Sequence, residues 1–237
     1  MNPGPRLRVL SYNAHDLLDD PDATAHVLRS CRPDVACLQE VPRRPLTRHR
    51  VERLARESGL VWSAGGRGSG GTAVFTSRRV DVLHGRTQAL PVAGPLTRTR
   101  GYALARVRLP GSAPLTVVSV HLPLRPAERL QHIRTVLRAL PDDEPHLVAG
   151  ALNEPPTGPV WAALTEHLRD VGADRDEPTY PAASPRRRID GLLVSPGLVA
   201  HDVRVVGASE HLSPEDLRSA SDHLPLLAEV ELPPAQA

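Results

Sequence analysis

Several residues that could take part in metal or acid–base chemistry stand at the ends of apolar segments. Glu40 follows the apolar segment 34–39, so its carboxylate is expected at the rim of a sheet, and Mg²⁺ or Mn²⁺ prefers such oxygen ligands. A divalent metal with a few fixed hydrogen-bond donors meets the needs of phosphate ester hydrolysis: neutralised phosphoryl charge, an oriented water and a stabilised leaving oxygen. Taken alone, Glu40 is better explained as a surface residue at a strand end.

A carboxylate and a histidine later in the chain could form a second functional group. Asp190 lies at the start of the strongly apolar segment 189–194, where a carboxylate must be paired or hydrogen-bonded. His223 could orient against it and act as a general base or as a charged clamp on a phosphate. A position in a turn, or an ion pair with neighbouring arginines, explains Asp190 as well. Asp222 and His223 are adjacent, so only a loop brings both side chains to one site.

The apolar pattern predicts the elements that must position these residues. Strands are predicted at residues 7–12, 34–39, 72–76, 80–84, 103–109, 115–121, 146–149, 189–194, 203–206 and 224–230. Helices are predicted at residues 22–30, 43–58, 126–140 and 159–168. The glycine-rich stretch 65–71 is expected to be a turn and lacks the spacing of a phosphate-binding loop. Strands on both sides of a central helix favour two β-sheets packed face to face with helices outside.

Composition places limits on the class of protein. The 237 residues, 40% of them hydrophobic, suit a single domain over residues 1–237, with residues 233–237 expected to be a frayed tail. The formal net charge is +2, and all 29 basic residues are arginine. Cys31 and Cys37 do not make a disulfide framework and favour a reduced compartment. We find no pattern of a signal peptide and no apolar run of bilayer length, and therefore expect a cytoplasmic monomer without stable membrane association.

Six short segments carry a resemblance to a known family. They are Leu10-Ser11-Tyr12-Asn13, Cys37-Leu38-Gln39-Glu40-Val41, Val118-Ser119-Val120-His121-Leu122, Gly150-Ala151-Leu152-Asn153, Arg188-Ile189-Asp190 and Ser221-Asp222-His223. Each is weak alone, but in this order they resemble the signatures of the endonuclease/exonuclease/phosphatase superfamily, the deoxyribonuclease I-like metal-dependent phosphoesterases. The resemblance implies an α/β fold, a four-layer α/β/β/α sandwich of two mostly antiparallel mixed β-sheets flanked by helices.

The resemblance also implies a role for each polar residue of these segments. Glu40, Asn13 and Asp222 would serve the metal, Mg²⁺ or Mn²⁺. Asp190 would orient His223, and His121 would lie against the reacting phosphate. Asn153 would donate its amide to the attacking water or to a phosphate oxygen.

The segment 150–153 resembles the family's motif Gly-Asp-x-Asn, but Ala151 stands where the motif has aspartate. The family's aspartate positions and activates the attacking water, and alanine has no acceptor, so the expected loss is about 10²-fold or more in rate. Three explanations stay open: an engineered inactive variant, a natural relative that has lost catalysis and only binds phosphate esters or nucleic acid, or partial substitution by Glu154. The third is the least favoured, because an adjacent residue normally points the other way.

The substrate does not follow from the core motifs, and the rim of the sandwich must decide it. We expect a phosphate ester, either nucleic acid or a small phosphoester, contacted by Arg100, Tyr102 and Trp161, with Tyr180 as a further aromatic of the rim. Trp62 and Phe75 are expected in the core. Further arginines could form a basic track or simply be solvated, and they are Arg43, Arg44, Arg48, Arg50, Arg53, Arg56, Arg98 and Arg186 to Arg188.

Overall fold

Two six-stranded sheets form the centre of the molecule. The computed structural model describes residues 4–92, 94 and 98–235. The first sheet has the order β11 (Val199–Val205), β12 (Leu226–Glu231), β1 (Arg6–Asn13), β2 (Val35–Gln39), β4 (Thr72–Thr76), β3 (Val61–Gly66). The second has the order β5 (Asp81–Leu90), β6 (Arg100–Arg108), β7 (Leu115–His121), β8 (His146–Ala151), β10 (Asp190–Val194), β9 (Arg169–Asp170).

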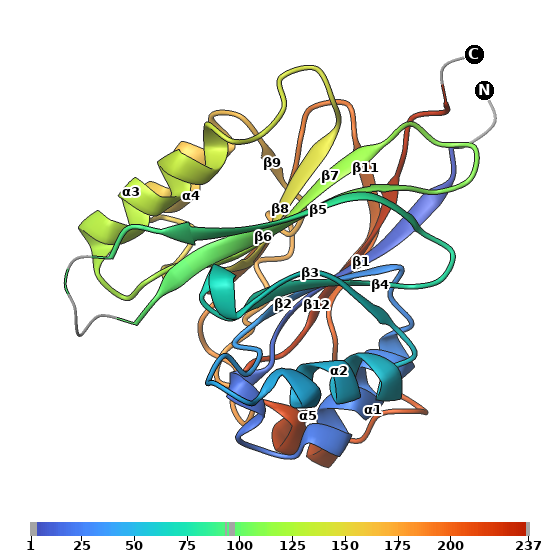
Figure 1. The fold of residues 1–237 in the computed structure, drawn as a ribbon, viewed down its shortest axis with the longest axis vertical. Helices are drawn as coiled ribbons and strands as arrows, with labels where there is room; N and C mark the ends of the chain where they lie inside the picture. The colour runs from blue at the N-terminus through green and yellow to red at the C-terminus, as the bar shows by residue number, and fades with distance from the viewer. Residues whose placement is uncertain (1–3, 93, 95–97, 236–237) are drawn as a thin grey trace.

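Helices cover the outer face of each sheet, as Figure 1 shows. The first sheet is covered by α1 (Pro21–Cys31), α2 (Arg48–Glu57) and α5 (Pro214–Ala220), and the second by α3 (Pro126–Leu137) and α4 (Pro159–Thr165). The expected four-layer sandwich is therefore confirmed. Only β1–β2 and β7–β8 pair in parallel among the described pairs, so both sheets are mixed and mostly antiparallel.

Alternation along the strands divides the apolar side chains among three layers of core. Leu7 and Val9 of β1 point into the layer between the sheets, whereas Leu10 and Tyr12 point to the layer under α1, α2 and α5. A third cluster packs β6, β7 and β8 against α3 and α4. This period of two fixes which face each later residue of a strand uses.

Some predicted elements differ from the structure. α2 starts at Arg48 rather than at residue 43, because Pro42 and Pro45 interrupt the segment before it. Residues 65–71 are not only a turn: β3 runs to Gly66 and a short 3₁₀ helix follows at Arg67–Ser69. The sequence patterns missed β3, β9 and α5, of which the last two are short.

The ends of the described chain are more ordered than expected. Residues 233–235 are not frayed, since Ser112 pairs with Pro234 and the Ala235 N–H donates to the Gly111 carbonyl at 3.0 Å. The rest of the expected tail, residues 236 and 237, lies outside the described residues. No helix in the described ranges has both the length and the apolar character needed to cross a bilayer.

Candidate active site

One edge of the space between the sheets collects the polar ends of five strands. The residues that share the inner face at this edge are Asn13 of β1, Gln39 of β2, His121 of β7, Ala151 of β8 and Asp190 of β10. Strand register sets the arrangement: Asn13 lies beside Gln39, and Ala151 lies between His121 and Asp190. Gln39 donates to Ser119 of the opposite sheet at 3.2 Å and so connects the two halves of the site.

Asn13, Glu40 and His121 form a chain of contacts across the edge. The Asn13 Nδ2 atom donates to Glu40 Oε1 at 3.3 Å, and the same oxygen lies 3.7 Å from His121 Nε2. The amide oxygen of Asn13 accepts from the His15 N–H at 2.9 Å. Asn13 therefore orients the Glu40 carboxylate. An amide oxygen has two lone pairs, so the metal role that was expected of Asn13 stays a prediction.

Asp190 and His223 are hydrogen-bonded inside the protein. His223 Nδ1 lies 2.8 Å from Asp190 Oδ2, which also accepts from the Thr179 hydroxyl. The Tyr180 ring lies 4.8 Å from the His223 ring, centroid to centroid. Burial opposes charge on His223, but the charge and hydrogen bond of Asp190 outweigh it, so the pKa of His223 is raised. The imidazole is therefore held in one orientation and keeps its charge to higher pH than a free imidazole does.

The arginine alternative for Asp190 does not hold. Arg188, the nearest arginine in sequence, makes two hydrogen bonds to Asp170, at 2.6 and 2.8 Å. Asp190 Oδ1 is buried and has no hydrogen-bond partner among the described residues. The carboxylate thus uses one oxygen for both Thr179 and His223, and its other oxygen is buried without a partner among the described residues.

Burial lowers the pKa of both His121 and Arg100, but only Arg100 keeps its charge at neutral pH. Burial lowers the pKa of His121 well below its ordinary value, and the charges of Arg100 and His223 lower it further, so His121 is neutral. Arg100 starts β6 and is only 7% exposed. Burial, followed by the charge of Arg43, lowers the pKa of Arg100 to about 10, which still leaves a guanidinium at neutral pH. The site therefore holds a neutral histidine beside a fixed cation.

Ala151 is fully buried between two functional residues. Its Cβ projects with those of His121 and Asp190, since side chains in register on neighbouring strands share a face. Glu154 cannot take the place of an acid here, because its carboxylate accepts from Arg129 Nε at 3.0 Å and from the Val160 N–H. The explanation by substitution from Glu154 is therefore wrong.

Asn153 and Asp222 complete the edge. Asn153 adopts a left-handed backbone conformation, with φ 59°, and its amide donates to the Leu122 carbonyl at 2.7 Å. Asp222 Oδ1 is buried, lacks a hydrogen-bond partner in the described chain and lies 4.0 Å from His15 Nδ1. A loop after α5 carries both Asp222 and His223, as their adjacency required.

Two expected rim contacts are wrong. Trp161 is 1% exposed and Tyr102 is 2% exposed, and both belong to the core under α3 and α4. The indole N–H of Trp161 donates to the Glu154 carbonyl, so even its polar atom faces inward. Trp62, expected in the core with Phe75, is half-buried instead and lies under the Arg48 guanidinium at 5.3 Å. Trp161 follows a proline-rich loop, and the local sequence does not indicate that α4 places its side chain in the core.

Sequence reasoning also missed two residues of the site. Thr179 supports Asp190, and His15 holds the amide of Asn13 through its backbone. Both lie in segments without apolar periodicity, so their positions follow only from tertiary packing.

The carboxylates fit an oxygen-preferring cation. Among the described residues, no three His, Cys, Asp or Glu side chains lie close enough together to hold a metal. Mg²⁺ commonly uses only one or two carboxylates and completes its coordination with water and phosphate oxygens. Glu40, 22% exposed at its side chain, and Asp222, with its buried and uncompensated oxygen, are the residues that would hold such an ion.

Solved structures share this fold. A protein of unknown function from Enterococcus faecalis V583 has a TM-score of 0.78 at 20% identity, covering 95% of this chain and 100% of its own. The mannosyl-6-phosphatase Bt3783 of Bacteroides thetaiotaomicron has a TM-score of 0.75 at 17% identity, covering 94% and 99%. D. rerio TDP2, complexed with a single-strand DNA product, has a TM-score of 0.70 at 19% identity, covering 95% and 99%.

A search of curated proteins finds no match to this chain. The model of the Endonuclease/Exonuclease/phosphatase family, in contrast, matches residues 9–223. That range contains every residue placed at the edge described above, from Asn13 to His223. The chain belongs to the Endonuclease/Exonuclease/phosphatase family.

Proposed function

We propose that this protein is a hydrolase of phosphate esters that depends on Mg²⁺ or Mn²⁺, and that Ala151 strongly impairs it. One observation carries the proposal: Glu40 and His121 face the Asp190–His223 pair across a single edge, with Ala151 between them. The family and its structural relatives include phosphoester hydrolases, one acting on a mannose phosphate and one complexed with a DNA product. Nucleic acid and small phosphoesters are both candidate substrates.

Each side chain has a distinct task in the proposed reaction. Glu40, with Asp222, would hold the cation, and a bound cation would neutralise charge on the phosphoryl oxygens. Charged His223 would donate its Nε2–H to a phosphate oxygen, kept in place by Asp190. Neutral His121 and the Arg100 guanidinium, both from the second sheet, would contact the same phosphate.

The missing task is activation of the attacking water. Asn153 can offer an amide hydrogen bond to a water, but accepting its proton needs a base near the position of Ala151, which has only a methyl group. The chain therefore retains binding groups and lacks one acceptor.

The test compares the protein with its Ala151→Asp variant for Mg²⁺- or Mn²⁺-dependent release from a generic phosphodiester and from plasmid DNA. We expect activity that appears, or rises at least about 10²-fold, only in the variant. Ala151→Asn is the matched control, because it adds a similar volume without a base. Silence from both proteins with ligand binding intact would instead support the second candidate, a non-catalytic protein that binds phosphate esters or nucleic acid.

A further inference from the structure

Two adjoining pockets beside the candidate site are lined by arginines. They share Arg44, Pro45 and Arg67, and have volumes of about 560 Å³ and 640 Å³. Arg48 and Trp62 line the first, and Arg43 and Arg98 line the second. We call these two pockets together the arginine groove.

Within the described part of the chain, the lining of the arginine groove holds positive side chains and no negative ones. Arg48 does pair with Glu52, but that carboxylate lies outside the lining. For the side chains of Arg44 and Arg67, no hydrogen bond or ion pair exists with any residue that the structure describes. Because like charges repel, guanidinium groups that line one groove favour an anion between them.

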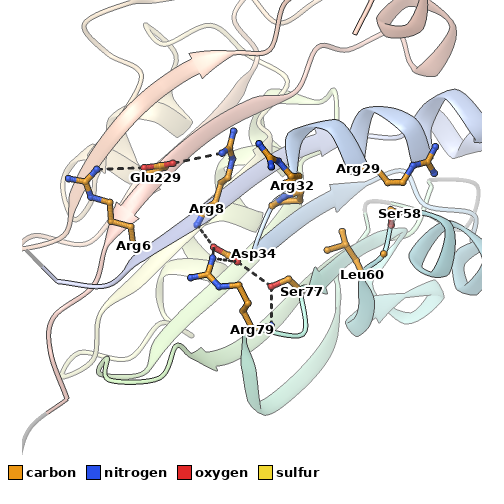
Figure 2. A pocket seen from close by; sticks show the side chains of 12 residues that line it. Arg6, Arg8, Arg29, Arg32, Asp34, Ser58, Leu60, Ser77, Arg79 and Glu229 are labelled. Atoms are coloured by element: carbon orange, nitrogen blue, oxygen red, sulfur yellow. Dashed lines mark hydrogen bonds and ion pairs between the residues drawn. The ribbon is translucent and has the colours of Figure 1, made fainter. Parts of the chain in front are cut away.

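Another arginine-lined pocket, in which three of the arginines pair with acids, allows a comparison. It lies at the other ends of β1 and β2, has a volume of about 790 Å³, and is drawn in Figure 2. There Arg79 pairs with Asp34 at 3.1 Å, and Arg6 and Arg8 lie 3.7 and 3.9 Å from Glu229. Two acids, Asp34 and Glu229, line that pocket beside its arginines, whereas the lining of the arginine groove holds no acid among the described residues.

The arginine groove opens onto the candidate site through Arg43. The Arg43 guanidinium donates to the carbonyls of Gly70 and Thr99, which fixes it at the junction. A Cβ on Gly71 would lie 3.5 Å from Arg43 Cδ and 3.8 Å from the Cα of Glu40, so that groove and site are neighbours. After burial, the charges of Arg43 and Arg98 lower the pKa of Arg100, so the positive field extends into the site.

We propose that the arginine groove is a subsite for a second phosphate group, so that the substrate carries at least one phosphate beyond the one in the candidate site. The inference rests on the proposed function and narrows its substrate class. Guanidinium groups suit this task because they bind phosphate oxygens through two parallel N–H donors. An ester with a single phosphate would leave the arginine groove empty.

Surface arginines are often merely solvated. An arginine of α2 that lies outside the groove can be compared with Arg44 and Arg67. Arg53 of α2 pairs with Glu57 and Asp22, as solvated arginines commonly do. Arg44 and Arg67, one before α2 and one in the 3₁₀ helix after β3, converge on one pocket wall from separate parts of the chain. That convergence distinguishes the arginine groove from a charged helix face.

Two kinds of molecule would carry the second phosphate: a polynucleotide or a compact bisphosphate. The experiment measures binding to the purified chain, with Mg²⁺ present, of oligothymidylates with one, two and four phosphodiesters, of hexyl phosphate and of 1,6-hexanediol bisphosphate. The double variant Arg44→Ala/Arg67→Ala tests the groove. The double variant Arg6→Ala/Arg32→Ala removes the same charge at the pocket of Figure 2 and is the matched control. Circular dichroism checks that each variant is folded.

In the unaltered chain and the control, the two-phosphate ligands should bind about 10-fold or more tightly than their one-phosphate counterparts at low salt. In the groove variant this ratio should fall to about 2-fold or less. For the oligothymidylates, the slope of log affinity against log salt should decrease by about 0.7 there, because the two arginines together neutralise one phosphate and each phosphate on a single strand contributes roughly 0.7. Affinity that keeps rising to four phosphodiesters would identify a polynucleotide, and saturation at the bisphosphate a compact ligand.

A ratio that survives in the groove variant, or that falls equally in the control, would overturn the proposal. Hydrolysis is scored separately with Ala151→Asp. If the affinity ratio differs between the groove variant and the control but no hydrolysis is seen, the subsite stands and the hydrolase is rejected. If single-phosphate esters are hydrolysed but the ratio is the same in both variants, the hydrolase stands and the subsite is rejected.

Discussion

Replacing Ala151 by aspartate should lower the stability of the protein while it supplies the missing base. The position is fully buried, and its side chain lies in register with Asp190, itself 3% exposed. Side chains in register have Cβ atoms about 5 Å apart. At an effective dielectric constant of about 20, two unit charges at about 5 Å repel by roughly 3 kcal/mol.

Neighbouring positive charge offsets part of this repulsion. Arg100 and the charged form of His223 lie on the same edge, so we expect a net loss of about 1–3 kcal/mol in the free energy of unfolding at pH 7 without metal. For a chain of this size, each kcal/mol lowers Tm by about 2–4 °C. Millimolar Mg²⁺ should restore stability, because a ligand at about 100 times its Kd stabilises the folded state by about 2.7 kcal/mol.

Thermal unfolding with and without Mg²⁺ measures both effects. Ala151→Asn, which adds volume without charge, separates repulsion from crowding and should show no comparable gain from Mg²⁺. A pH series adds a second check, since the penalty should be small near pH 4, where the new carboxyl is protonated, and grow toward pH 7. If the aspartate variant is as stable as the parent without metal, and indifferent to Mg²⁺, the side chain does not face Asp190 and the reasoning from strand register fails.

Three further outcomes follow from residues outside the candidate site. Trp161→Ala should cost about 3–5 kcal/mol in unfolding free energy and leave ligand affinity unchanged, because the indole fills the core under α3 and α4; a selective loss of affinity in a stable variant would contradict this. Arg129→Ala should cost about 3–5 kcal/mol, because it strands the buried Glu154 charge, and denaturant unfolding should show a smaller loss for the double variant Arg129→Met/Glu154→Leu. Burial opposes ionisation of Glu144, but hydrogen bonds from Arg106 and Thr116 outweigh it and lower its pKa. This contribution to stability is present above the unfolded pKa of about 4.3 and is lost as pH falls through the lower folded value, so the stability curves of the parent and Glu144→Gln should converge at acid pH.

The long periodic elements could be predicted from the sequence because burial alone decides them. The strands ending at His121 and Thr76 have the predicted bounds, and α3 starts at Pro126, where a proline can occupy the first turn. Strand β3 was missed because its burial pattern mixes exposed and half-buried positions, with little apolar alternation.

Some features of the candidate site could be predicted from the sequence, and others depend on tertiary packing. Glu40 and His121 were singled out by the resemblance, because either residue alone at the end of an apolar strand is better explained without a functional role. The structure brings the two together, with Glu40 Oε1 3.7 Å from His121 Nε2. The engagement of the Asn13 amide by the His15 backbone and the inward turn of Trp161 depend on tertiary packing. Local sequence carries no trace of either, so neither the contact at Asn13 nor the place of Trp161 in the core could be predicted.

The site separates its charges into two zones. Carboxylates of Glu40, Asp190 and Asp222 gather at the strand ends, and arginines from Arg43 onward lead away from them into the arginine groove. A phosphate ester approaching the carboxylates is repelled unless a cation is bound there, whereas its second phosphate is attracted by the groove without one. Ala151 removes one negative charge from the first zone if an aspartate is the family's residue at that position. The chain should then hold its ligand with less dependence on metal than its Ala151→Asp variant.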